Sequence, residues 1–107
     1  MTVTQLHADN FESTLKSAQQ PVVVDFYAQW CGPCRALAPV LEDLAQKLKG
    51  RISIYKANVD ELPEQAQKYG IRGVPTLIVF KGGNEIDRIT GALPKDQLSR
   101  YLEGIRI

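Results

Sequence analysis

The stretch VVVDFYAQWCGPCR, residues 22–35, decides the fold. It begins with an apolar, β-branched run, which is typical of a strand buried on both faces. Both cysteines of the chain, Cys31 and Cys34, follow within a few residues, and apolar residues at helical spacing continue from them as far as Gly50. The stretch therefore predicts a buried strand that leads directly into a helix, with the two thiols at the N-terminus of that helix.

Outside this stretch, four more segments have the composition of strands and three more have the spacing of helices. The expected strands are residues 2–6, 22–28, 51–59, 76–81 and 85–90, and the expected helices follow Asp9, Cys31, Asp60 and Pro94. Asp9 and Glu12 have the spacing of a capping box, and Asp60 is expected to cap the third helix. The order βαβαβαββα, with a parallel crossover first and a hairpin last, predicts an α/β fold with a mixed sheet and helices on both faces.

Length and composition set the class of protein. The chain has 107 residues, 44% hydrophobic and 23% charged, which fits a single globular domain over residues 1–107. A net charge of +1 gives no reason to expect nucleic acid or an acidic membrane as a partner. The N-terminus lacks the pattern of a signal peptide, and the apolar runs are too short to span a bilayer. We expect a cytoplasmic protein; a mature protein of an organelle stroma or matrix is the alternative.

The two cysteines have three possible roles: a structural disulfide, a metal site or a redox pair. A disulfide that closes a loop of about four residues stabilises a fold by roughly 2 kcal/mol at best. A structural zinc site needs four ligands, and the chain offers two cysteines and one histidine, His7. No metal site is therefore expected. Residues i and i+3 share a helix face, and the helix N-terminus favours the thiolate of Cys31, so the spacing predicts a redox pair.

The residues between the cysteines tune this pair. Gly32 adds no side chain that could shield Cys31, and Pro33 suits the first turn of a helix, where its missing N–H has no partner to lose. Neither residue carries a charge that would stabilise the thiolate further. The Gly-Pro pair therefore favours a dithiol that donates electrons.

The sequence resembles the thioredoxin family over essentially its whole length. The resemblance depends on VVVDFYAQWCGPCR, Pro39, YKANVD, GIRGVPTLIVFKGG and TGALPK, which occur in that order. It implies a central five-stranded mixed sheet flanked by four helices, and a protein disulfide reductase with Cys31 as nucleophile and Cys34 as resolving thiol. The resemblance also implies a monomer with no bound cofactor besides the redox-active disulfide. The implied partners are proteins that contain disulfides and a thioredoxin reductase that depends on NADPH or ferredoxin.

Resolution of a mixed disulfide requires a proton acceptor for Cys34, and Asp25 is the candidate. Its position inside an apolar strand predicts burial, which raises a carboxyl pKa toward the working pH of a general base. The alternative is a structural ion pair with Lys56. The resemblance supports both ideas, with Lys56 near Asp25 and influencing its titration.

Five further residues are expected to form a substrate-binding surface. Trp30 precedes the nucleophile in a loop, which is a poor place for a core residue. The resemblance implies that Trp30 flanks the sulfur atoms and that the Val74–Pro75 peptide is cis and faces the cysteines. Gly73 and Gly91 are expected to line the same surface, where the backbone of a substrate pairs with this segment.

Two other functions are compatible with this sequence. One is an oxidase or isomerase of the same fold, and the uncharged Gly-Pro pair argues against it. The other is a redox-dependent binding module or scaffold without turnover, which the two cysteines do not exclude.

Overall fold

A computed structural model describes residues 2–105 as five strands and four helices. The strands form one mixed sheet, as the sequence predicts, and their order in the sheet is β1-β3-β2-β4-β5. The elements, in chain order, are β1 (Thr4–Gln5), α1 (Phe11–Ser17), β2 (Val22–Tyr27), α2 (Gly32–Lys47), β3 (Ser53–Asn58), α3 (Pro63–Lys68), β4 (Thr76–Lys81), β5 (Asn84–Thr90) and α4 (Lys95–Glu103).

Strand β2 lies at the centre of the sheet, and all of its residues except the last are buried. It pairs in parallel with β3 and antiparallel with β4. The parallel register places Asp25 opposite Lys56. The predicted parallel crossover and C-terminal hairpin are both present.

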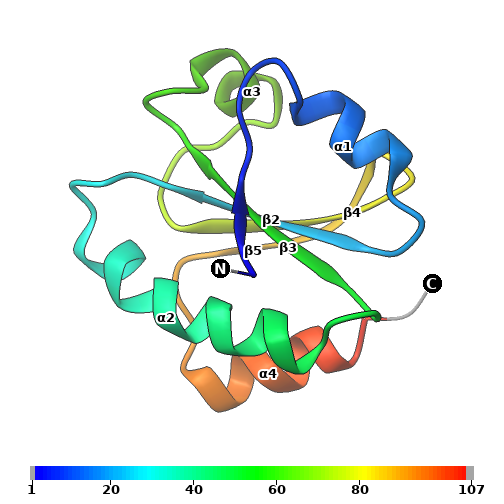
Figure 1. Cartoon of the computed structure of the whole chain (residues 1–107). Helices are drawn as coiled ribbons and strands as arrows, with labels where there is room; N and C mark the ends of the chain where they lie inside the picture. The colour runs from blue at the N-terminus through cyan, green and yellow to red at the C-terminus, as the bar shows by residue number, and fades with distance from the viewer. Residues whose placement is uncertain (1, 106–107) are drawn as a thin grey trace.

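Helices cover both faces of the sheet, α2 and α4 on one face and α1 and α3 on the other (Figure 1). Side chains alternate along β2, so Val23 packs in the core under α2 and α4 while Val24 and Phe26 pack in the core on the opposite face. Both faces are apolar, which explains why this strand lacks the alternation of a half-exposed one. Asp25 is two residues after Val23, so its side chain lies on the same face of the sheet, the face that α2 covers.

Two predicted helix caps are wrong. Helix α1 begins after Asn10 and has no side-chain cap, and the Asn10 Oδ1 instead accepts a hydrogen bond of 2.8 Å from the His7 backbone N–H. Helix α3 begins at Pro63 after Leu62, again without a side-chain cap. Proline suits the first position because the N–H it lacks would have no helical partner there. Asp60 is therefore free to make a different contact, described below.

Candidate active site

Cys31 and Cys34 form a disulfide at the N-terminus of α2, with their Cα atoms 5.3 Å apart. Cys31 is the N-cap residue, and its Sγ accepts a hydrogen bond of 3.1 Å from the backbone N–H of Cys34. The residues are only 5% and 3% exposed. The local cause is the one that the sequence indicates: β2 ends at Tyr27, a short loop follows, and Pro33 lies in the first turn of the helix.

The carboxyl group of Asp25 lies in a pocket that Cys34 also lines. This active-site pocket has a volume of about 350 Å³, and its walls include Tyr27, Ala38 and Lys56. Asp25 is 4% exposed, and its Oδ1 is buried without a hydrogen-bond partner among the described residues. The arrangement brings a buried carboxyl group, which has an unused acceptor atom, beside the second cysteine.

Burial raises the pKa of Asp25 from 3.8 to about 7, and the positive charge of Lys56 opposes this rise. No ion pair joins the two side chains in residues 2–105, so the structural ion-pair alternative does not hold. Lys56 instead lies over the ring of Tyr27, with Nζ 5.9 Å from the centroid. Desolvation is therefore the dominant influence on Asp25, and Lys56 moderates it at longer range.

Trp30 is 70% exposed beside the disulfide, which agrees with the expectation that it does not belong to the core. Its Nε1–H donates a hydrogen bond of 2.9 Å to Oδ2 of Asp60. This contact holds a large aromatic surface next to the cysteines. It also gives Asp60 a place in the site that the sequence did not indicate, because its partner lies thirty residues away.

The loop before β4 forms the other side of the site. The Val74–Pro75 peptide is cis, and the Sγ of Cys31 lies 3.8 Å from the carbonyl oxygen of Val74. The backbone N–H of Gly91 donates a hydrogen bond of 2.8 Å to the carbonyl oxygen of Pro75. Gly91 has a φ of +90°, a conformation that favours glycine. A Cβ at Gly73 would meet no atom of residues 2–105 within 4 Å, so no contact among these residues requires glycine there.

The structure thus brings most of the predicted residues to one end of the sheet, around the disulfide. Gly32 is exposed in the first turn of α2, where a Cβ would meet only the Arg35 guanidinium at 3.9 Å. Arg35 itself donates a hydrogen bond of 2.7 Å to the Gln29 carbonyl oxygen. Sequence reasoning missed Ala38, whose place in the pocket wall becomes visible only when α2 packs on β2.

The described residues hold no cluster of three or more His, Cys, Asp or Glu side chains that could bind a metal ion. Within the same part of the chain, none of the helices has the length and apolar character needed to cross a membrane.

Comparison with known proteins identifies the family. The family model described as Thioredoxin matches residues 2–104. The chain belongs to the thioredoxin family. Thioredoxin 1 of Nostoc sp. is 48% identical over 99 residues, which are 92% of this chain and 92% of the relative. Thioredoxin of Synechocystis sp. is 44% identical over 99 residues, again 92% of this chain and 92% of the relative. The chloroplastic thioredoxin M-type of Pisum sativum is 44% identical over 94% of this chain and 59% of its own length.

Family membership and the paired cysteines together establish the reaction class. The chain is a thiol–disulfide oxidoreductase that acts as a protein-disulfide reductase. The Cys31–Cys34 disulfide is the oxidised form of its redox pair.

Proposed function

We propose that the protein reduces disulfides of other proteins through a mixed disulfide on Cys31, which Cys34 resolves with Asp25 as its proton acceptor. The observation that carries the proposal is the pocket that Cys34 shares with a buried, unpartnered carboxyl group. A carboxyl group with a pKa of about 7 can accept and release a proton near neutral pH.

The first step uses the thiolate of Cys31. It attacks one sulfur of the substrate disulfide, forms the mixed disulfide, and releases the other substrate sulfur as a thiolate that takes a proton from water. The N–H of Cys34 and the positive end of the α2 dipole favour negative charge on the Cys31 sulfur. Gly32 and Pro33 keep this end of the helix uncharged and open, which favours electron donation.

The second step uses Cys34. Its thiol gives a proton to the Asp25 carboxylate, and the resulting thiolate attacks the Cys31 sulfur. The Cys31–Cys34 disulfide forms, the substrate leaves as its second thiolate, and two electrons have passed to the substrate. Lys56 keeps part of the Asp25 population ionised, since its charge opposes the effect of burial.

The substrate-binding surface in this proposal comprises Trp30, Gly73, Val74, Pro75 and Gly91. Trp30 supplies an exposed aromatic contact, and the segment 73–75 pairs with substrate backbone. The open space around Gly73 supports such an approach.

Recycling requires a partner that reduces the Cys31–Cys34 disulfide. We assign this role to a thioredoxin reductase dependent on NADPH or ferredoxin, and we propose that residues 1–107 work as one monomeric domain with no bound cofactor besides the redox-active disulfide. A reversible dithiol suits the reducing cytoplasm. A chloroplastic relative makes an organelle stroma the alternative.

A disulfide reduction assay on insulin tests the nucleophile. The wild-type protein should reduce insulin with dithiothreitol as electron source, and Cys31→Ser should be inactive. Cys34→Ser should accumulate covalent complexes with substrate proteins, which non-reducing electrophoresis detects. Trapping by Cys31→Ser instead would reverse the two assignments.

Step-resolved kinetics test Asp25. Asp25→Asn should slow release of the mixed disulfide far more than its formation, because only release requires the Cys34 proton to leave. In the wild type the release rate should rise with pH up to about 7, the Asp25 pKa. Equal slowing of both steps would count against Asp25 as the proton acceptor.

A further inference from the structure

Asp25 lines a second pocket, on the side away from Cys34. This N-terminal pocket has a volume of about 370 Å³, and its walls include Val3, Pro39 and Glu42. It shares Asp25, Ala38 and Lys56 with the active-site pocket. The carboxyl group therefore lies between two pockets, one lined by Cys34 and the other by Val3.

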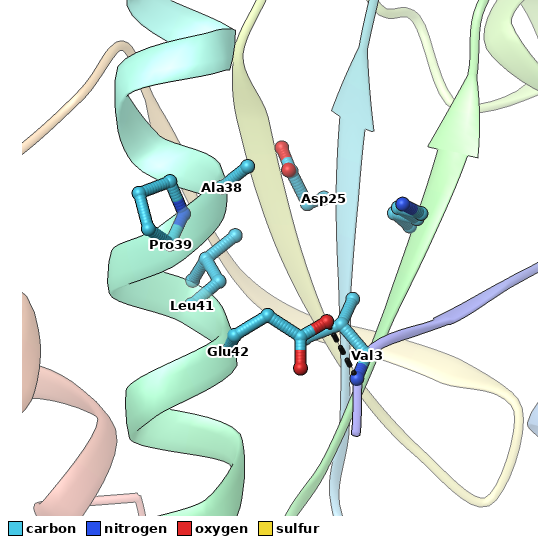
Figure 2. Close-up of a pocket in the computed structure, with 7 residues that line it drawn as sticks. Val3, Asp25, Ala38, Pro39, Leu41 and Glu42 are labelled. Atoms are coloured by element: carbon cyan, nitrogen blue, oxygen red, sulfur yellow. Dashed lines mark hydrogen bonds between the residues drawn. The ribbon is translucent and has the colours of Figure 1, made fainter. Parts of the chain in front are cut away.

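Glu42 holds the N-terminal segment at this second pocket. Its Oε1 accepts a hydrogen bond of 2.8 Å from the backbone N–H of Thr2, and its Oε2 accepts one of 3.1 Å from the backbone N–H of Val3. Figure 2 shows Asp25 and Glu42 projecting into the space between α2 and the sheet from opposite sides, with Glu42 reaching Val3. Both carboxylate oxygens are thus used to tie the start of the chain to the middle of α2.

Backbone pairing of this segment with the sheet begins only after Val3. Strand β1 is two residues long and pairs only through Thr4 and Gln5 with β3. Val3 lies before this pairing and is nevertheless 5% exposed. The side chain of Val3 packs in the aliphatic core, and the two hydrogen bonds to Glu42 fix its backbone at the pocket wall.

We propose that Glu42 is a positioning residue for the proton-transfer site: by fixing Thr2 and Val3, it closes the N-terminal pocket and keeps bulk water from the Asp25 carboxyl group. The effect of Glu42 on catalysis rests on the proposed role of Asp25 as proton acceptor, whereas the closure of the pocket does not depend on that role.

Few charged groups of residues 2–105 face Asp25, so its burial from water remains the main influence on its pKa. Lys56 faces it from β3, Tyr27 lies on its own strand, and Arg35 and Glu42 line the two pockets from α2. Its β4 register partner is the apolar Leu77. Burial is the largest cause of the raised pKa of Asp25, so added water should lower that pKa toward 3.8.

The test measures the Asp25 pKa by NMR of the carbon-13-labelled carboxyl group in the oxidised protein. Glu42→Ala should lower the pKa by roughly 1 unit, because both hydrogen bonds are lost and water enters. Amide exchange at Val3 should become faster in the same variant. The pH profile of mixed-disulfide release should move down by the same amount.

Three further variants distinguish the effect of closing the N-terminal pocket from the effect of the negative charge of Glu42. Val3→Ala shortens the pocket wall but keeps the Glu42 charge, and should also lower the Asp25 pKa. Glu42→Gln removes the charge but keeps one acceptor, and should shift the pKa less than Glu42→Ala. Glu12→Ala is the matched control, since this carboxylate bonds Lys68 and Tyr69 on the other face of the sheet and should leave Asp25 unchanged.

Two results would overturn the inference. One is an unchanged Asp25 pKa in Glu42→Ala although amide exchange at Val3 is faster. The other is an equal shift in Glu42→Ala and Glu42→Gln with none in Val3→Ala, which would assign the effect to charge alone. A shifted pKa without a shifted release profile would support the closure and contradict Asp25 as proton acceptor.

Discussion

The two faces of the sheet are built differently. On the α1 and α3 face, four aromatic rings pack together: Tyr69 lies 5.2 Å from Phe80 in an edge arrangement, and Phe11 lies 6.0 Å from Phe26, measured between centroids. On the α2 and α4 face the core is aliphatic. That second face also contains the Asp25 carboxyl group and the two pockets of about 350 and 370 Å³.

A single strand, β2, serves both stability and chemistry. Phe26 and Asp25 are neighbours in β2, and the alternation of side chains sends them to opposite faces. Phe26 packs in the aromatic core, while Asp25 is buried without a hydrogen-bond partner, an arrangement that destabilises a fold. We infer that the aromatic face stabilises the fold enough to tolerate an unfavourable carboxyl group on the other face.

The largest expected effect would come from the aromatic face. Phe80→Ala should lower the free energy of unfolding by about 3–5 kcal/mol, because a fully buried ring leaves a cavity among other rings. Urea unfolding measures this loss. Disulfide reduction by the fraction still folded should stay close to that of the wild type, since Phe80 faces away from Asp25. A loss below about 1 kcal/mol would contradict the division between the faces.

Asp25→Asn should have an effect of the opposite sign on stability above neutral pH. The wild-type pKa is about 7 in the fold and 3.8 for ordinary aspartate, so between these values the folded state binds more protons than the unfolded state. Wild-type stability should therefore fall by about 4 kcal/mol as the pH rises from about 4 to above 7. The asparagine variant lacks this titration.

Urea unfolding at pH values on both sides of this window measures the difference. The stability of Asp25→Asn should depend less on pH, and the variant should exceed the wild type above neutral pH. Parallel pH profiles for the two proteins would show that Asp25 is not the unfavourable group in this face.

Trp30→Ala tests the edge of the site, where an exposed side chain can contribute to substrate binding while contributing little to stability. The KM for a protein substrate should rise by about five- to thirtyfold, equivalent to roughly 1–2 kcal/mol of binding. The free energy of unfolding should change by less than about 0.5 kcal/mol, because the side chain is 70% exposed. Asp60→Asn is a useful control, since it keeps an oxygen acceptor for the Trp30 Nε1–H. An unchanged KM would remove Trp30 from the binding surface.

Gly73→Ala should have the smallest effect. The added Cβ would contact none of the residues that the structure describes, so stability should not change. A substrate backbone that approaches closely would meet the added methyl group, and the KM should rise by about two- to fivefold, roughly 0.5–1 kcal/mol. Gly91 is a poorer choice, because its φ of +90° would strain any replacement. Unaltered kinetics would place the substrate away from Gly73.

Much of the fold and the chemistry followed from local sequence. The apolar run of β2 predicted a central strand, and the cysteine spacing predicted a pair at the N-terminus of α2. These features depend on residues close to one another along the chain, where backbone geometry limits the outcome. The predicted caps at Asp9 and Asp60 failed because short polar side chains have several partners within reach. Asn10, not Asp9, precedes α1, and its Oδ1 accepts a hydrogen bond from the His7 backbone N–H, while Asp60 accepts one from Trp30.

The sequence alone determined that a carboxyl group lies in a buried strand before two paired thiols, because a run of apolar residues and a four-residue motif carry that information locally. Only the tertiary structure decided which face Asp25 occupies, that Cys34 shares its pocket, and that Glu42 ties residues 2 and 3 over the far side. The physical reason is that desolvation depends on everything that surrounds a group. The residues that exclude water from Asp25 come from the start of the chain, from α2 and from β3, and packing alone brings them together.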